Sequence, residues 1–222
     1  MQQNAVIFDM DGLLIDSEPL WQKAGQQALL PFNIELTAEQ YHSSTGLRTP
    51  EWIEHWFTHF NIDTTHSNST IDSIETLALN QIQESGLALP GVEYIMEFFA
   101  ARKFKIGLAS SSPLKLIEMV VDKLQIRSHL DAITSAEGLP FGKPHPQVFI
   151  NCAEALGIAT SRCIVFEDSF NGMIAAKAAK MRCVVVPEAT SVNSIKWGAA
   201  DLQLESLLQF NEKELVGLGF GW

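Results

Sequence analysis

The stretch Ala5-Val-Ile-Phe8-Asp9-Met-Asp11-Gly12 places two aspartates and a glycine directly after four apolar residues. A short apolar run of this kind is typical of a strand that is buried on both faces of a parallel sheet. Ligands of open α/β sheets bind beyond the carboxyl ends of the strands, where Asp9 and Asp11 would lie. The stretch therefore predicts an α/β fold with a functional site beside these two carboxylates.

Further runs of strand-like sequence follow at residues 105–109, 130–134, 163–166 and 183–186. Helical patterns lie before or between them, at residues 92–101, 113–124, 146–156 and 172–181. Strands that alternate with helices form a parallel sheet that is covered by helices on both faces. We therefore expect a three-layer, Rossmann-like α/β core.

The segment between the first two strands breaks this alternation. It has no clear strand, and its helix-like stretches lie at residues 19–30, 38–43, 49–60 and 70–85. The polar residues 66–70 are interpreted as a loop between two of these helices. We expect a small helical cap domain at residues 16–86, inserted into a core that consists of residues 1–15 and 87–222.

Composition excludes several classes of partner. The 222 residues include 15 Lys and Arg against 26 Asp and Glu, so that the net charge is −11. So acidic a chain is a poor general binder of nucleic acid or of anionic membranes. No apolar run approaches the about 18 residues of a transmembrane helix. The odd set of cysteines, Cys152, Cys163 and Cys183, lacks a CxxC pattern and is interpreted as reduced thiols of a cytoplasmic protein. A monomer is expected.

The polar residues at the predicted strand ends form a set suited to phosphoryl transfer. A carboxylate can attack phosphorus, and a second acid can protonate the leaving oxygen and then activate water. Mg²⁺ takes oxygen ligands, and a lysine offers positive charge to the phosphoryl group. The set consists of Asp9 and Asp11, the serines at residues 110–112, Lys143 in Gly142-Lys143-Pro144, and Glu167 with Asp168.

This set resembles the four motifs of the haloacid dehalogenase-like phosphatases, in order and over nearly the whole chain. The segment after the first motif resembles the small helical cap of that family. The longer stretches at residues 8–21, 46–48 and 143–148 resemble a bacterial subgroup that acts on 2-deoxyglucose 6-phosphate and on hexitol phosphates. The resemblance thus implies a phosphatase for a small phosphorylated sugar or sugar alcohol.

The resemblance also implies a role for each residue. Asp9 would be the nucleophile and a Mg²⁺ ligand, and Asp11 the general acid and base, with its main-chain carbonyl on the metal. Asp168 would complete the metal site, assisted by Glu167. The transferring phosphoryl group would be held by Ser110, the main-chain N–H of Ser111 and Lys143. The Lys–Pro bond of the third motif is often cis in relatives, and the resemblance therefore implies a cis bond between Lys143 and Pro144.

Three other functions are considered. A sugar phosphomutase of the β-phosphoglucomutase type shares this scaffold, but such mutases carry a histidine where this chain has Trp21. A binding module without activity would not need Asp11, and carbon–halogen hydrolases of the wider superfamily lack this second aspartate. Many relatives also carry Ala-Gly-Met where this chain has Ala179-Lys-Met181, away from the chemistry. Hydrolysis is the favoured prediction.

Each motif also has an ordinary structural interpretation. Aspartates in a DxDG sequence commonly stabilise turns, a lone lysine is usually solvated, and serines before a proline often cap a helix. Two acids at a helix start are favoured by the helix dipole. We prefer the functional interpretation because the four motifs occur together.

The cap offers fewer signals. Arg48, in Gly46-Leu-Arg48, is assigned to substrate binding, with a surface arginine at a helix start as the alternative. Glu18 would line the cleft between cap and core or lie at a helix end. The aromatic residues Trp52, Trp56, Phe57 and Phe60 repeat at helical spacing and are interpreted as the core of the cap. The tail at residues 216–222 is interpreted as a docked or frayed terminus.

Overall fold

Six parallel strands form one sheet in the part of the chain that the computed structural model describes, residues 3–189 and 191–220. The spatial order is β3-β2-β1-β4-β5-β6, so that the predicted first strand lies near the middle. The strands are β1 (Ala5–Phe8), β2 (Lys105–Ser110), β3 (Ala132–Ser135), β4 (Cys163–Glu167), β5 (Arg182–Val185) and β6 (Leu202–Gln203). The two-residue β6 is too short to leave a pattern in the sequence, and it was not predicted.

Helices cover both faces of this sheet. Side chains alternate between the faces along a strand, so that Val6 and Phe8 of β1 pack into one apolar cluster and Ala5 and Ile7 into another. The first cluster includes α5 (Val92–Ala101), α6 (Leu114–Lys123) and α9 (Glu212–Gly217). The second includes α7 (Gln147–Leu156) and α8 (Phe170–Ala178). The prediction of a three-layer α/β core is confirmed.

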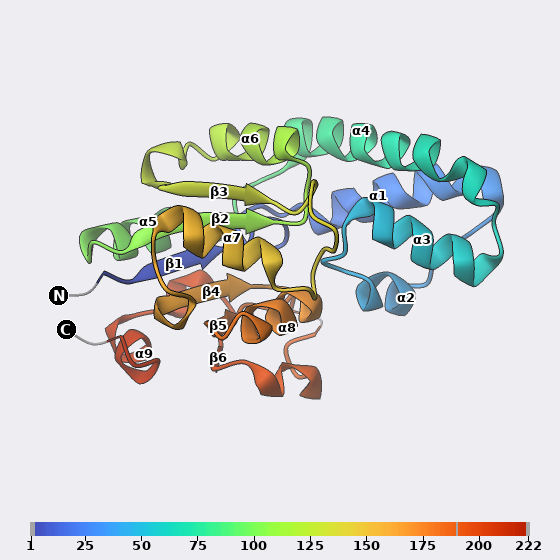
Figure 1. Cartoon of the computed structure of the whole chain (residues 1–222). Coiled ribbons are helices and arrows are strands. Elements are labelled where there is room, and N and C mark those ends of the chain that lie inside the picture. The colour runs from blue at the N-terminus through green and yellow to red at the C-terminus, as the bar shows by residue number, and fades with distance from the viewer. Residues whose placement is uncertain (1–2, 190, 221–222) are drawn as a thin grey trace.

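Four further helices lie beyond the carboxyl ends of the strands, at the right of Figure 1. They are α1 (Glu18–Leu29), α2 (Ala38–Ser43), α3 (Thr49–Phe60) and α4 (Ser67–Ser85). Helix α4 packs against both α1 and α3, and it also contacts α6 of the core. The helical character of this segment was predicted, and its exact division at residues 16–86 stays a prediction.

The start of α4 corrects one expectation. Residues 66–70 were predicted to be a polar loop, but Ser67–Ser85 is one helix. The hydroxyls of Ser69 and Thr70 donate to the main-chain oxygen of His66 over 3.0 and 2.8 Å. Serine and threonine side chains form hydrogen bonds to the main chain of the same turn and are favoured near a helix N-terminus. Their polarity therefore marks the first turn of the helix.

The two crossings between these helices and the core lie side by side. Ile15 forms an antiparallel bridge with Ala88. The main-chain N–H of Asp16 donates to the oxygen of Leu87 over 2.9 Å, and that of Leu89 donates to Leu14 over 3.0 Å. The chain therefore enters and leaves the inserted helices at one hydrogen-bonded pair of segments.

Other expectations about the chain have mixed outcomes. Cys152, Cys163 and Cys183 are buried and unpaired, as predicted. The helix expected at residues 113–124 is Leu114–Lys123, so that Pro113 lies just before its first residue. Among the described residues, no helix has both the length and the apolar character needed to cross a membrane. Of the predicted tail, Phe220 packs against the first apolar cluster, and residues 221–222 lie outside the described residues.

Lys180 has a left-handed backbone with a φ of 61°. This conformation costs a residue with a β-carbon about 1–2 kcal/mol. Lys180→Gly is therefore expected to raise the free energy of unfolding by about 0.5–1 kcal/mol, after the greater freedom of glycine in the unfolded chain is deducted. Urea unfolding followed by circular dichroism measures the change.

The same substitution inside a helix supplies the control. Lys115→Gly in α6 is expected to lower the free energy of unfolding by about 1 kcal/mol, because glycine is a poor helix former. Equal destabilisation by both substitutions would contradict this account of Lys180.

Candidate active site

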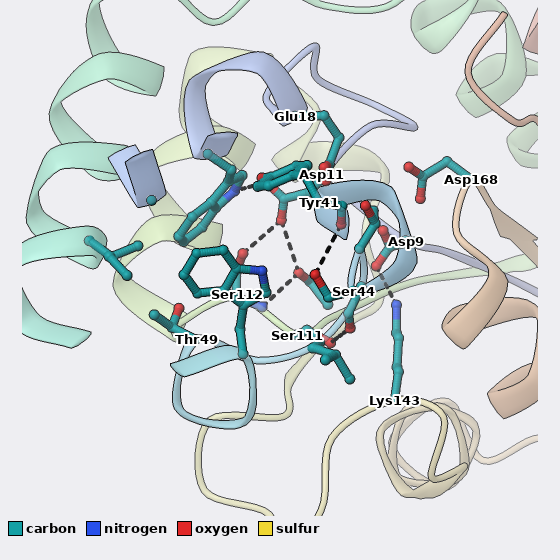
Figure 2. A pocket seen from close by; sticks show the side chains of 18 residues that line it. Asp9, Asp11, Glu18, Tyr41, Ser44, Thr49, Ser111, Ser112, Lys143 and Asp168 are labelled. Carbon is teal, nitrogen blue, oxygen red and sulfur yellow. Dashed lines mark hydrogen bonds and ion pairs between the residues drawn. The ribbon is translucent and has the colours of Figure 1, made fainter. Parts of the chain in front are cut away.

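An open cavity lies between the carboxyl ends of the strands and the helices of the cap segment, with about 690 Å³ of empty space that includes its opening to solvent. Figure 2 shows Asp9, Asp11, Lys143 and Asp168 around it, with Tyr41 contributed by the cap segment. The strand ends converge here because β1, β2 and β4 are neighbours in the sheet. The polar residues predicted to meet at this edge therefore do so.

Lys143 is the buried charge at the centre of the site. Its side chain is 2% exposed, and its Nζ lies 2.5 Å from Oδ1 of Asp9 and 2.6 Å from Oε1 of Glu167. Burial by itself lowers the pKa of a lysine, but the two carboxylates outweigh it and raise the pKa of Lys143. The ammonium therefore stays charged beside Asp9. The peptide bond between Lys143 and Pro144 is cis, as the resemblance implied.

The other oxygen of Glu167 organises the loop after β4. Oε2 accepts hydrogen bonds from the main-chain N–H of Asp168 and of Ser169, over 3.1 and 3.0 Å. The Ser169 hydroxyl also donates to it over 2.9 Å, and it accepts from the Gly172 N–H at the start of α8. A β-carbon at Gly172 would lie 1.8 Å from Oε1 of Glu167. The glycine thus makes room for this carboxylate.

The site has an excess of acid. Asp9, Glu167 and Asp168 each offer an oxygen within 4.8 Å of the others. Burial, with Glu167 and Asp11 nearby, raises the pKa of Asp9 to about 8 despite Lys143. Burial and the nearby carboxylates likewise raise the pKa of Asp168 and bring that of Glu18 to about 8. Clustered carboxylates of this kind become favourable when a cation binds among them.

Gly12 is required for the close approach of Asp168. Its φ is +70°, and a β-carbon there would lie 2.1 Å from Oδ2 of Asp168. The turn after Asp11 therefore needs glycine for two reasons: its backbone conformation, and the space that the Asp168 carboxylate occupies.

Asp11 is oriented by donors from both parts of the chain. Its Oδ1 accepts from the Ser17 hydroxyl over 2.7 Å and from Nε1 of Trp21 over 2.9 Å. Its Oδ2 accepts from the hydroxyls of Ser112 over 2.7 Å and Ser110 over 3.4 Å. Ser17 and Trp21 lie at the start of the inserted segment, whereas the serines follow β2. The position of this carboxylate thus depends on both.

Part of the cavity wall is apolar. This part includes the rings of Trp21, Tyr41 and Trp52 and the side chain of Ile74. The hydroxyl oxygen of Thr45, which also lines the cavity, is buried and has no hydrogen-bond partner within the described structure. Aromatic faces with a free hydroxyl suit a neutral group that can itself form hydrogen bonds.

Most of the predicted site residues line this cavity, namely Asp9, Asp11, Ser110, Ser111, Lys143 and Asp168. Arg48 is not among the residues that line the cavity. Its guanidinium donates to main-chain oxygens of the loop after β3, including Ala136 over 3.0 Å. Its assignment to substrate binding stays a prediction.

Some contacts of the site were missed from the sequence. Ser17 donates to Asp11, but an isolated serine near a turn carries no distinctive signal. Ser112 was included in the polar set without a role, and the structure shows that it also donates to Asp11. Trp52 was interpreted as cap core; it packs in the apolar cluster and also lines the cavity. Trp21 was noted only for replacing a histidine, and its hydrogen bond to Asp11 became visible in the structure.

Comparison with known proteins fits this arrangement. Residues 6–186, from β1 through the end of β5, match the family model described as haloacid dehalogenase-like hydrolase. The chain belongs to the haloacid dehalogenase-like hydrolases. The family expected from the sequence is therefore confirmed, and with it the expectation of an enzyme.

Curated relatives of this hydrolase resemble it over most of their length. Hexitol phosphatase B of Escherichia coli strain K12 is 38% identical over 214 residues, 96% of each chain. Fructose-1-phosphate phosphatase YqaB of the same strain is 28% identical over 182 residues, which cover 82% of this chain and 95% of that protein. Among solved structures, β-phosphoglucomutase from Clostridium difficile shares the fold, with a TM-score of 0.85, 23% identity and coverage of 97% and 96%.

Trp21→Phe tests the hydrogen bond between cap segment and Asp11. The substitution keeps an aromatic wall but removes the N–H that donates to Oδ1. Since leaving a buried hydrogen-bonding group without its partner costs about 1–3 kcal/mol, kcat is expected to fall about tenfold or more. Steady-state phosphate release measures the change.

Trp56→Phe is the matched control for this prediction. Its indole donates to the Ser44 hydroxyl over 3.3 Å within the cap segment, away from Asp11. Its kcat should stay close to that of the parent enzyme. Equal kcat values for the two variants would show that the Trp21 contact does not serve catalysis.

Proposed function

We propose that this hydrolase removes phosphate from monophosphates of sugars or sugar alcohols, with Asp9 as the nucleophile. The observation that carries the proposal is the position of the Asp9 carboxylate at the end of β1, 2.5 Å from the Lys143 ammonium. Asp11 lies two residues further on, and its carboxylate accepts four hydrogen bonds. A nucleophile, an acid and base, and a cation are thus gathered at one end of a cavity. Phosphoryl transfer requires these three elements.

The donor set also fits a divalent cation, which we propose is Mg²⁺. Asp9, Asp168 and the main-chain carbonyl of Asp11 would hold the metal, with Glu167 nearby. All these donors are oxygen atoms, the ligands that Mg²⁺ prefers. The raised pKa of Asp9 and of Asp168 indicates that these acids lack sufficient positive charge from the protein. The metal would supply positive charge beside the transferring phosphoryl group.

The residues divide the reaction between them. Asp9 attacks phosphorus as the bond to the sugar oxygen breaks, and protonated Asp11 gives its proton to that oxygen. Lys143, the Ser110 hydroxyl and the Ser111 N–H hold the phosphoryl oxygens. After the alcohol leaves, Asp11 takes a proton from water, which attacks the aspartyl phosphate and releases inorganic phosphate. The cap segment excludes other water while the first bond breaks.

The rest of the cavity favours a neutral leaving group. Lys143 is the only cationic side chain among the described residues that line it, so that one phosphate is accommodated at the Asp9 end. The aromatic walls and the free Thr45 hydroxyl suit the carbon–hydrogen faces and hydroxyls of a polyol. The names of the two Escherichia coli relatives agree with this class. We therefore propose 2-deoxyglucose 6-phosphate and hexitol phosphates as substrates.

The phosphomutase alternative is less well supported. A mutase that works through a bisphosphate must bind a second phosphate at the far end of its cavity. Here the described residues that line the cavity include no cation besides Lys143, and the acidic Glu18 is among them. The likeness to β-phosphoglucomutase at 23% identity concerns the fold. The three buried, unpaired thiols agree with action in the reducing cytoplasm, which we include in the proposal.

Asp9→Asn tests the nucleophile. The amide keeps the shape of the side chain but cannot form the aspartyl phosphate, so that kcat should fall by about four orders of magnitude or more. Phosphate release from hexitol phosphates with Mg²⁺ is the measurement, and EDTA should abolish the activity of the parent enzyme. The control, Asp72→Asn, changes an exposed aspartate on α4 and should leave kcat unchanged. Turnover by Asp9→Asn at the parent rate would refute the mechanism.

A comparison of substrates tests whether the cavity accepts only one phosphate group. Hexitol and hexose monophosphates should be hydrolysed with a kcat/KM at least about 100-fold above that of hexose bisphosphates. A second phosphate would have to enter next to Glu18 without a cationic partner, which costs several kcal/mol. Equal kcat/KM values would contradict the single-phosphate cavity, and isomerisation of a hexose 1-phosphate would favour the mutase.

A further inference from the structure

The loop that leads into α3 connects the cap segment to three different parts of the core. The Ser111 hydroxyl after β2 donates to the oxygen of Gly46 over 2.8 Å. The Asn171 amide in the first turn of α8 donates to the oxygen of Thr45 over 2.8 Å. The third connection, made by Arg48 and Glu51, is the most extensive, and the mechanism above does not use it.

Arg48 binds the main chain of the loop after β3. Its side chain is 11% exposed, and it reaches three carbonyl oxygens of this loop. These oxygens belong to Ala136 at 3.0 Å, Leu139 at 2.5 Å and Pro140 at 3.3 Å. One planar guanidinium thus ties together a loop that has no helix or strand between residues 136 and 146.

Glu51 completes the connection from the first turn of α3. Its Oε1 accepts from the Arg48 guanidinium over 2.7 Å and from the main-chain N–H of Gly142 over 2.7 Å. Burial would raise the pKa of Glu51, but these donors outweigh it and lower that pKa. The carboxylate is therefore charged, and it holds the residue that directly precedes Lys143.

The packing around Gly142 is tight on the same side. A β-carbon at this position would lie 2.4 Å from Oε2 of Glu51 and 2.8 Å from Cγ of Arg48. The loop thus fits against these two side chains of the cap segment only because residue 142 is a glycine. This steric fit is an observation separate from the hydrogen bonds.

We propose that Arg48 and Glu51 are positioning residues which hold the loop after β3, so that Lys143 is correctly placed at Asp9 only while the cap segment is seated on the core. The inference rests on the proposed function, since it assigns these residues to the same reaction. The cap segment then does more than cover the substrate. It also sets the position of a catalytic cation that the core supplies.

Arg48→Ala tests this role with two substrates. A hexitol phosphate fills the whole cavity, whereas p-nitrophenyl phosphate has a good leaving group and makes few polar contacts at the far end. If Arg48 positions Lys143, kcat should fall about 10- to 100-fold for both, because misplacement of a catalytic group by about 1 Å has effects of this size. A rise of KM for the hexitol phosphate alone would show that Arg48 binds substrate, and would overturn the proposal.

Gly142→Ala approaches the same contact from the core without a change of charge. The added methyl group should displace the loop from Glu51 and lower kcat for both substrates in the same way. Glu54→Ala, an exposed carboxylate of the same helix α3, is the control and should leave kcat unchanged. Full activity of Arg48→Ala and Gly142→Ala would refute the role.

Backbone hydrogen exchange separates this inference from the proposed function. In Arg48→Ala, residues 136–143 should exchange at least about tenfold faster, since the Gly142 N–H loses its firmly held acceptor. The sheet should keep its protection, which also shows that the variant is folded. Faster exchange without any phosphatase activity in the parent enzyme would refute only the proposed function. Unchanged exchange would refute the positioning role whatever the activity.

Discussion

The ammonium of Lys143, enclosed between the carboxylates of Asp9 and Glu167, is the interaction on which the rest of the site depends. A charge that is 2% exposed is tolerated only when its partners are held at hydrogen-bonding distance. The sheet provides this, because β1 and β4 are adjacent and deliver the two carboxylates side by side. Residue 172 must then be glycine, because a β-carbon there would collide with the Glu167 carboxylate. The loop after β3 must place Lys143 between the two carboxylates.

The groups proposed for catalysis belong to the core, but their arrangement also depends on the inserted segment. Asp11 receives hydrogen bonds from Ser112 of the core and from Trp21 of α1. Arg48 and Glu51 form hydrogen bonds to the main chain of the loop that carries Lys143. Both halves of the acid–base and electrostatic machinery are therefore sensitive to where the inserted helices lie. A cavity built in this way is complete only when the two parts are in contact.

The sequence allowed the prediction of features that local patterns control. An apolar run followed by acids locates β1 and Asp9, and the repeat of this pattern locates β4 and Asp168, because burial and strand direction act within a few residues. The contacts of Arg48 could not be predicted, since its partners are main-chain oxygens about 90 residues away, brought near only by docking of the inserted helices. The first turn of α4 was missed because serine and threonine serve loops and helix starts equally well. The two-residue β6 depends on its neighbour β5 rather than on its own side chains.

The paired crossings at residues 14–16 and 87–89 have a consequence for how such a protein can diversify. Both ends of the inserted segment leave the core at one point. The segment is therefore a closed loop relative to the sheet, and its ends stay together whatever its length. The entropy of closing a loop grows only with the logarithm of its length, so that doubling an insert adds about 0.6 kcal/mol. An architecture with a single narrow neck can therefore exchange one lid for a larger or smaller one while the strand order and the buried carboxylates stay as they are. A replacement segment would have to keep the contacts to Asp11 and to the loop before Lys143 that the present one makes.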